Sequence, residues 1–151
     1  MDIDIDSVAV LGAGSMGHGI AEVAAIAGYD VVLRDVEEEI VQEGYDQIEW
    51  SLGKLEENGQ VADPDEVLDR VSTAVDLEPA VADADLVIEA APEDLELKRS
   101  IFADVDAAAP ADAIIATNTS SLRVGDIATE TDRPERCCGL HFFNPPVKMD
   151  L

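Results

Sequence analysis

A glycine-rich turn between an apolar run and a helical pattern restricts this chain to few folds. Gly12, Gly14 and Gly17 form G-x-G-x-x-G directly after the apolar run 7–11 and directly before a segment with helical spacing. In such a unit the first glycine permits the tight turn, the second lets the backbone approach a pyrophosphate, and the third allows close helix–strand packing. The pyrophosphate then lies at the helix N-terminus, where free N–H groups and the helix dipole favour an anion. The residues predicted to hold a dinucleotide are Gly12, Ala13, Gly14, Ser15, Met16 and Gly17.

An acidic residue follows the next apolar run at the expected distance. The run 31–34 ends at Asp35, about 20 residues beyond the glycines, where a carboxylate accepts hydrogen bonds from the adenosine ribose hydroxyls. A carboxylate here repels a 2′-phosphate, which favours NAD over NADP as the cofactor. The neighbouring Arg34 is able to pair with a 2′-phosphate, which favours NADP. The alternative is a plain glycine turn in which Asp35 is a solvated strand end.

Apolar runs alternate with helical patterns, which is typical of βαβ units and a parallel sheet. Strands are predicted near residues 7–11, 31–34, 71–75, 86–90, 113–117 and 137–140. Helices are predicted near residues 15–28, 37–57, 78–83, 93–108 and 121–128, with a short helix opening at Asp63-Pro64. The helix 37–57 is expected to be interrupted at Gly44 and Gly53. We therefore expect an α/β fold of the Rossmann type, a doubly wound and mostly parallel sheet with helices on both faces, formed by residues 1–151 as one domain.

The chain is strongly acidic. It has 34 Asp and Glu against 9 Lys and Arg, which gives a net charge of −25. Nucleic acid is excluded as a partner, because phosphate contacts need a basic face. The acids are spread along the chain, and this predicts a salt-adapted protein whose surface repulsion is screened at high ionic strength. The alternative is an ordinary acidic domain.

Other sequence features argue against membrane, redox and metal functions. There is no run of about 20 apolar residues that would span a membrane, and the first residues, Met1 to Asp6, lack the basic start of a signal peptide. We therefore expect a cytoplasmic protein with no membrane partner. Cys137 and Cys138 are adjacent in an apolar run, so we expect buried or half-buried thiols and no redox pair. No histidine cluster accompanies them, so no metal site is expected.

A histidine stands just past the last predicted strand, at the edge where open parallel sheets bind ligands. His141 follows the apolar run 137–140 and precedes two phenylalanines. Imidazole takes up and releases protons near neutral pH, so a histidine facing a nicotinamide is well placed as a general base. The alternative is a histidine that only caps a strand or fills a packing gap.

Four segments together resemble the N-terminal, NAD-binding domain of the L-3-hydroxyacyl-CoA dehydrogenase family, which includes 3-hydroxybutyryl-CoA dehydrogenases. The segments are residues 12–21 (GAGSMGHGIA), 85–90 (DLVIEA), 118–122 (NTSSL) and 139–146 (GLHFFNPP). In that family the enzyme oxidises the 3-hydroxyl of an acyl-CoA to a ketone and passes hydride to NAD. The resemblance implies the same reaction here, in β-oxidation of fatty acids or in butyrate metabolism.

The resemblance also implies roles for residues near the reacting atoms. His141 matches the catalytic base that takes the hydroxyl proton, and Ser120 matches a serine that hydrogen-bonds the substrate oxygen near the nicotinamide. Asn144 matches an asparagine beside the nicotinamide. Ser120 has an alternative role as N-cap of the helix that follows it.

Three further residues match family positions that contact the cofactor or CoA. Glu93 and Lys98 match contacts to the nicotinamide ribose region, and Ser51 matches a serine that contacts CoA. Each has a structural alternative. Glu93 is also expected as an acid stabilised at a helix N-terminus, Lys98 as a partner of Asp94 at i,i+4 spacing, and Ser51 as an exposed helical serine without a function.

The chain departs from the family pattern in two places. A glutamate that orients the catalytic histidine would fall just beyond Leu151, and a helical C-terminal domain for substrate binding and dimerisation would follow it. We therefore expect a fragment that binds NAD but is a poor catalyst alone, completed by a homo-oligomer or a companion chain. Asn58 also stands where the family has a lysine for CoA phosphates, with Lys54 one turn earlier. Two other functions stay open, a non-catalytic NAD-binding module and a dehydrogenase of a free hydroxy acid.

Overall fold

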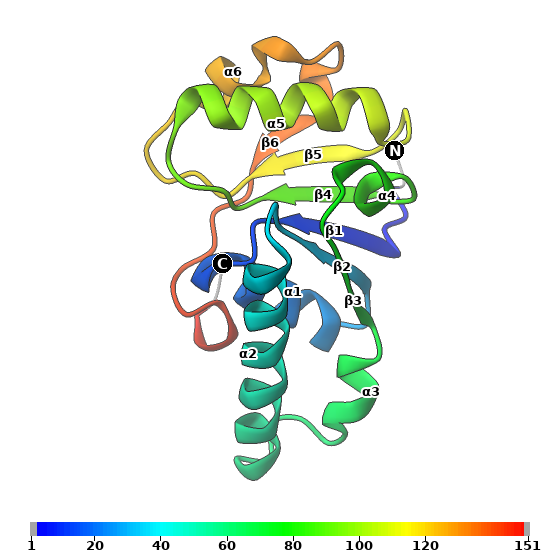
Figure 1. The fold of residues 1–151 in the computed structure, drawn as a ribbon, viewed down its shortest axis with the longest axis vertical. Helices are drawn as coiled ribbons and strands as arrows, with labels where there is room; N and C mark the ends of the chain where they lie inside the picture. The colour runs from blue at the N-terminus through cyan, green and yellow to red at the C-terminus, as the bar shows by residue number, and fades with distance from the viewer. Residues whose placement is uncertain (1–2, 150–151) are drawn as a thin grey trace.

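Six parallel strands form one sheet in the computed structural model, which describes residues 3–149 (Figure 1). The strands are β1 (Ser7–Leu11), β2 (Asp30–Arg34), β3 (Val71–Ala74), β4 (Leu86–Glu89), β5 (Ile114–Thr117) and β6 (Cys137–Gly139). Their order in the sheet is β3-β2-β1-β4-β5-β6. The order reverses between β1 and β4, which is the point where doubly wound sheets bind ligands. The expected fold class is confirmed.

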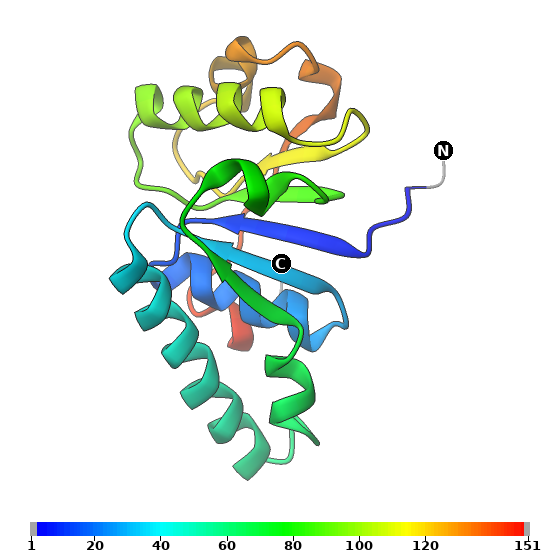
Figure 2. The ribbon, with the colours of Figure 1, turned by 45° about the vertical axis from the view of Figure 1, so that its right-hand side comes forward.

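Helices cover both faces of the sheet (Figure 2). They are α1 (Ser15–Ile26), α2 (Glu38–Glu57), α3 (Pro64–Leu68), α4 (Leu77–Val81), α5 (Leu95–Ala108) and α6 (Val124–Ile127). Short 3₁₀ turns are η1 (Ala128–Glu130), η2 (Pro134–Arg136) and η3 (Pro146–Lys148). The expected start of α3 is confirmed, because the Asp63 carboxylate accepts a hydrogen bond from the Glu66 N–H and Pro64 is the first helical residue.

Alternation along the strands builds two hydrophobic cores. On β1, Val8 and Val10 face α1 and α2, whereas Ala9 and Leu11 face α4 and α5. Successive side chains of a strand point to opposite faces, so a strand buried on both sides reads as a continuous apolar run. This is why the strand segments are recognisable in the sequence.

The expected interruption of the long helix is wrong. Helix α2 runs without a break through Gly44 and Gly53. A Cβ on Gly44 would lie 2.9 Å from the carbonyl oxygen of Ala13, so Gly44 lets the helix approach the glycine turn closely. A Cβ on Gly53 would meet nothing within 4 Å.

The helix expected at 121–128 is shorter than its sequence suggests. Helix α6 begins at Val124, and Arg123 occupies the N-cap position. The capping role considered for Ser120 is therefore wrong. The hydroxyl of Thr119 instead accepts a hydrogen bond from the Leu122 N–H at 3.1 Å, and this keeps the segment before α6 as a loop.

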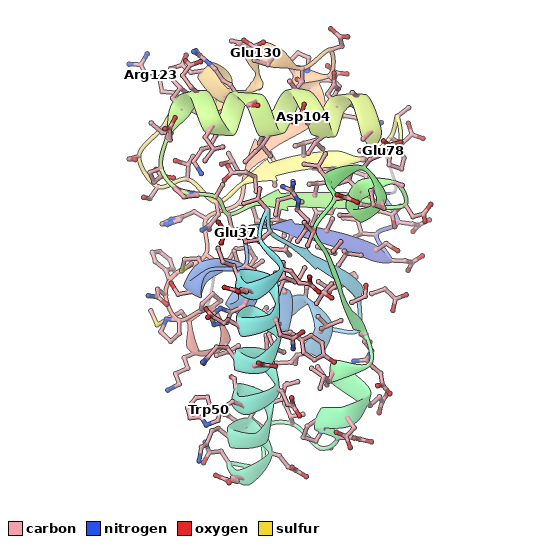
Figure 3. All side chains as sticks on the ribbon, in the orientation of Figure 1. Glu37, Trp50, Glu78, Asp104, Arg123 and Glu130 are labelled. Carbon is pink, nitrogen blue, oxygen red and sulfur yellow. The ribbon has the colours of Figure 1, made fainter. Side chains whose placement is uncertain are left out.

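Acidic side chains are spread over the molecule. Glu37 before α2, Glu78 on α4, Asp104 on α5 and Glu130 on η1 lie in different parts of the molecule in Figure 3. Within residues 3–149 no helix has both the length and the apolar character needed to cross a bilayer, and no group of three or more His, Cys, Asp or Glu side chains is arranged to hold a metal.

The two cysteines are free thiols with different exposure. Cys137 is half-buried, as expected, whereas Cys138 is exposed. Desolvation of the sulfur, which is partial for the exposed residue Cys138, is the main cause that raises the pKa of both thiols above its ordinary value. This keeps them protonated and poor nucleophiles.

One carboxylic acid is buried between α1 and α2. The Glu22 side chain on α1 is only 1% exposed. Among residues 3–149, its Oε1 is the one buried side-chain nitrogen or oxygen that takes part in no hydrogen bond. Burial raises the pKa of Glu22 from 4.5 to about 7, and the neighbouring Ser51 hydroxyl on α2 opposes this shift only in part.

Replacing Glu22 with glutamine is expected to stabilise the protein in a pH-dependent way. Below pH 4.5 the folded and unfolded states both hold the proton. As pH rises from 4.5 to about 7 the unfolded state ionises first, so the carboxyl's contribution to stability is lost over that window. Glu22→Gln removes this loss, and we expect a gain of about 2–3 kcal/mol at pH 8 and almost none at pH 4.5. Urea unfolding at both pH values measures it.

The control for this prediction is Glu43→Gln, which removes an exposed carboxylate from α2. It is expected to change stability by less than about 0.5 kcal/mol at either pH. Equal stabilisation by Glu22→Gln at both pH values would contradict the buried-acid interpretation.

Candidate cofactor and active site

A hollow of about 570 Å³ lies at the carboxyl ends of β1, β2 and β4. The glycine turn after β1, Asp35 after β2 and the loop after β4 all line it. The lining residues used below are Gly12, Gly14, Ser15, Met16, Arg34, Asp35, Ala90, Ala91 and Pro92. The hollow is therefore at the topological switch point, with the N-terminus of α1 at its floor.

The glycine turn has the geometry that the motif predicts. Gly12 has φ 111°, a conformation that favours glycine, and a Cβ there would lie 2.6 Å from the Ala90 carbonyl oxygen. A Cβ on Gly17 would overlap the Gly12 carbonyl oxygen, so only glycine lets α1 pack against the turn. A Cβ on Gly14 would meet nothing within 4 Å. The backbone at Gly14 thus faces open space, which fits the approach of a pyrophosphate.

Asp35 braces the turn as well as lining the hollow. Its Oδ2 accepts a hydrogen bond from the Ala13 N–H at 2.9 Å, and its Oδ1 accepts one from the Val36 N–H at 2.7 Å. The side chain is half-buried, so the alternative of a solvated strand end does not describe it. Arg34 donates from Nε to the Val75 carbonyl oxygen at 2.7 Å, which engages one of its donors within the protein.

A second hollow of about 310 Å³ joins the first. Both hollows are lined by Met16, Ala90, Ala91 and Pro92. The second one brings together four residues predicted from the sequence, which are Glu93, Ser120, His141 and Asn144. The two hollows are therefore adjacent, and the glycine turn lines one while His141 lines the other, an arrangement that suits the two halves of a dinucleotide.

Hydrogen bonds from β5 hold the segment that carries His141. The Leu140 N–H donates to the Thr117 carbonyl oxygen at 2.9 Å, and the Phe142 N–H donates to Asn118 Oδ1 at 2.8 Å. The imidazole of His141 is exposed and stacks edge-on against Phe143, with ring centroids 5.3 Å apart. This side chain is held by its flanking residues while its ring stays open to a ligand, so a pure packing role does not describe it.

Glu93 binds the loop that carries Ser120. Its Oε2 accepts hydrogen bonds from the Thr119 hydroxyl at 2.7 Å and the Ser121 hydroxyl at 2.6 Å. Burial raises the pKa of Glu93, but the Ser121 and Thr119 hydroxyls together with the Lys98 ammonium outweigh it, so this pKa is lower than usual. The residue that caps α5 is Asp94, which accepts a hydrogen bond from the Leu97 N–H.

Lys98 lies behind the second hollow. Its side chain is 1% exposed, and its Nζ is 2.6 Å from Glu89 Oε2 and 3.3 Å from Glu93 Oε1. The considered pairing with Asp94 is therefore wrong, since Lys98 turns inward. Glu89 is a further buried partner that was not among the predicted site residues, although an acid at the end of the apolar run 86–88 is a usable signal.

The predicted CoA contact is separate from both hollows. Ser51 is half-buried on α2 beside Glu22 and lines neither hollow. Asn58 is exposed at the C-terminal end of the same helix. The Lys54 ammonium lies 3.5 Å from Glu57 and 5.7 Å from the ring centroid of Trp50, which points outward in Figure 3.

The sequence profile of a family described as "3-hydroxyacyl-CoA dehydrogenase, NAD binding domain" matches residues 7–151. This chain belongs to that family. As a member of the 3-hydroxyacyl-CoA dehydrogenase NAD-binding family it takes NAD as its cofactor, in agreement with the glycine turn and Asp35.

Individual relatives support the same assignment. A probable 3-hydroxybutyryl-CoA dehydrogenase of Deinococcus radiodurans is 43% identical over 143 residues, which cover 94% of this chain and 51% of that protein. The crystal structure of 3-hydroxybutyryl-CoA dehydrogenase from Escherichia coli K12 is similar with a TM-score of 0.93 and 42% identity, over 97% of this chain and 31% of the other. A diketoreductase structure is similar with a TM-score of 0.89 and 36% identity, over 95% and 52% of the two chains. The chain spans about half the length of the curated relatives it matches.

Proposed function

We propose that this chain is the cofactor-binding part of an NAD-dependent dehydrogenase that oxidises the 3-hydroxyl of an L-3-hydroxyacyl-CoA to a ketone. The observation that carries the proposal is the pair of adjacent hollows, one lined by the glycine turn and the other by Ser120, His141 and Asn144. The bound nicotinamide supplies the hydride acceptor in this reaction. The rest of the chemistry falls to side chains of the second hollow.

In the proposed mechanism, neutral His141 accepts the proton of the substrate hydroxyl as the C3–H bond breaks. Ser120 donates a hydrogen bond to the same oxygen, which stabilises it as it gains carbonyl character. In the reverse direction the His141 imidazolium returns the proton to the developing alkoxide. Asn144 and Glu93 line the same hollow and orient the nicotinamide end of the cofactor.

The acyl-CoA cleft is proposed to need residues beyond this half of the fold. The relatives are about twice as long as the chain, and the resemblance assigns substrate binding and dimerisation to a helical C-terminal domain. A homo-oligomer or a companion chain would supply the remaining contacts. Ser51 stays a predicted CoA contact on α2, and the cytoplasmic location expected from the sequence stays a prediction.

A second candidate is a dehydrogenase of a carbonyl compound that carries no CoA. Asn58 in place of the expected lysine weakens the case for CoA phosphates, and a similar solved structure is described as a diketoreductase acting on dicarbonyl compounds. Rates of NADH oxidation with acetoacetyl-CoA and with free acetoacetate separate the two. The proposal expects the CoA ester to react faster and free CoA to inhibit. Faster reduction of free acetoacetate, with no effect of CoA, would favour the second candidate.

Replacing Asp35 with asparagine is expected to weaken NADH binding by about tenfold, the effect of losing one charge-assisted hydrogen bond. Asparagine keeps one oxygen for the Ala13 N–H of the turn and loses the acceptor of the exposed Val36 N–H. NADPH binding should not weaken, because the repulsion of its 2′-phosphate is removed while Arg34 remains. Fluorescence titrations with both cofactors measure this, with Asp30→Asn at the other end of β2 as the control. An unchanged preference for NADH would contradict the role of Asp35.

Salt adaptation is part of the proposal, and its support is the net charge of −25, with acidic residues spread along the chain. At molar salt the screening length is about 3 Å, so repulsion between surface carboxylates is largely removed. The unfolding temperature is therefore expected to rise steadily from dilute buffer to molar KCl. An unfolding temperature that falls over this range would contradict salt adaptation, and one that stays constant would indicate an ordinary acidic domain.

A further inference from the structure

A buried carboxylate lies beneath the second hollow and has no part in the proposed chemistry. Glu89 is the last residue of β4 and is 0% exposed. Its Oε1 accepts a hydrogen bond from the Thr117 hydroxyl at 2.6 Å. Its Oε2 accepts from the Lys98 ammonium and from the Ala91 N–H, each at 2.6 Å. One side chain thus connects β5, α5 and the loop that lines both hollows.

The contacts continue from Glu89 to the loop that carries Ser120. The Lys98 ammonium lies between Glu89 and Glu93, and Glu93 accepts hydrogen bonds from the residues on either side of Ser120. Those residues are Thr119 and Ser121. Because its two neighbours are both bound to one carboxylate oxygen, the path of the backbone at Ser120 depends on where Glu93 stands.

A second branch leads to the segment that carries His141. The Asn118 N–H donates to the main-chain carbonyl oxygen of Glu89 at 2.9 Å, and Asn118 Oδ1 accepts from the Phe142 N–H. This branch begins at the main chain of Glu89 and does not depend on its carboxylate, so replacing the side chain is expected to disturb the Ser120 loop and to leave the His141 segment in place.

The buried ion pair of Glu89 and Lys98 is not expected to add much to the stability of the fold. Taking two charges out of water costs about as much as their attraction returns, and apolar replacements of a buried pair are often equally stable. What a fully hydrogen-bonded buried pair does supply is a fixed geometry, because each partner has only one satisfactory position.

We infer that Glu89 is a positioning residue which, through Lys98 and Glu93, sets the geometry of the Ser120 loop and hence of the nicotinamide half of the site. The inference rests on the proposed function, since it assumes that the second hollow receives the nicotinamide half of NAD. Ligand binding at the first hollow is not expected to depend on Glu89. Binding of ADP, which has the adenosine and pyrophosphate but no nicotinamide half, should therefore be insensitive to this residue.

Two variants separate positioning from stabilisation. Glu89→Gln leaves the buried Lys98 ammonium with the partly exposed Glu93 as its remaining charged partner, so it is expected to lower both stability and NADH affinity. The double variant Glu89→Gln/Lys98→Met removes both buried charges at similar volume, although the Ala91 carbonyl oxygen loses the Lys98 donor, so it should recover part of the stability. Titrations with NADH and with ADP, and urea unfolding, are measured for each on the whole chain.

We expect the double variant to bind ADP as the unsubstituted chain does and to bind NADH about tenfold to hundredfold more weakly, which is the effect of losing one or two charge-assisted hydrogen bonds. A double variant that recovers NADH affinity together with stability would overturn the inference. So would failure of both variants to fold, since the pair would then be needed for folding instead. If the unsubstituted chain binds no NADH, the proposed function itself fails.

The matched control is another ion pair of α5. Asp106, in the last turn of the helix, lies 2.7 Å from Arg133, and both side chains are largely buried. Asp106→Asn should lower stability and leave the ratio of NADH to ADP affinity unchanged. A control that changes this ratio as much as the Glu89 variants do would overturn the inference.

Discussion

Replacing His141 with alanine is expected to lower the rate of acetoacetyl-CoA reduction by about 10²–10⁴-fold, the usual contribution of a general acid or base. His141 lines the second hollow together with Ser120, and its imidazole is exposed to that hollow. The substitution removes the group that exchanges the proton and leaves the cofactor contacts in place. NADH affinity should therefore stay unchanged. Absorbance of NADH, followed at high protein concentration so that slow turnover is detected, gives both rates.

The control for His141→Ala is the other histidine of the chain. His18 is half-buried in the first turns of α1 and does not line the second hollow. His18→Ala is expected to retain the full rate. Equal rates for the unsubstituted chain and His141→Ala would contradict the proposed mechanism and favour a module that binds NAD without catalysis.

Gly17→Ala is expected to lower the stability of the fold, whereas Gly14→Ala is expected to lower mainly the affinity for NADH. A Cβ on Gly17 would overlap the Gly12 carbonyl oxygen, so the turn and α1 must move apart. We expect Gly17→Ala to lose about 3 kcal/mol or more of stability, the upper part of the range for overpacking, and to lose NADH binding with it. A Cβ on Gly14 meets no protein atom within 4 Å, and φ at Gly14 is −67°.

Gly14→Ala therefore leaves stability within about 1 kcal/mol, the effect of a changed N-cap residue. Its methyl group stands where the pyrophosphate is predicted to approach, so NADH affinity should fall by about tenfold or more, at least about 1.4 kcal/mol. Urea unfolding and NADH titration of both variants test the pair. Unchanged NADH binding by a folded Gly14→Ala variant would show that the dinucleotide does not cross this turn.

The parts of the fold that were predictable are those that local chemistry decides. The strands are buried on both faces, so segments such as 7–11 and 31–34 read as apolar runs. The turn at Gly12 needs a positive φ, which few residues other than glycine adopt. The cap at Asp63 needs only a hydrogen bond to the N–H of Glu66, three residues along the chain. The carboxyl ends of parallel strands share one edge, so His141 and Ser120 were expected near the glycine turn.

The parts that were not predictable depend on contacts distant in sequence. Gly44 resembled a helix breaker, but its position opposite Ala13 makes it a close-packing residue within α2. Lys98 has an acid at i−4, yet burial directs it to Glu89 on the neighbouring strand. Glu93 resembled a helix-terminal acid, and its hydroxyl partners come from the loop after β5. In each case the contacting residue is distant in sequence, and the folded sheet brings the two residues together.

The central claim is that the joined hollows at the switch point bind NAD. Calorimetric titration of the chain with NADH in molar KCl tests this most directly, because it depends on no missing substrate contact and on no turnover. We expect saturable binding of one NADH per chain, weaker binding of NADPH and weakened NADH binding by Gly14→Ala. A folded chain that takes up no NADH, or that binds NADPH equally well, would contradict it.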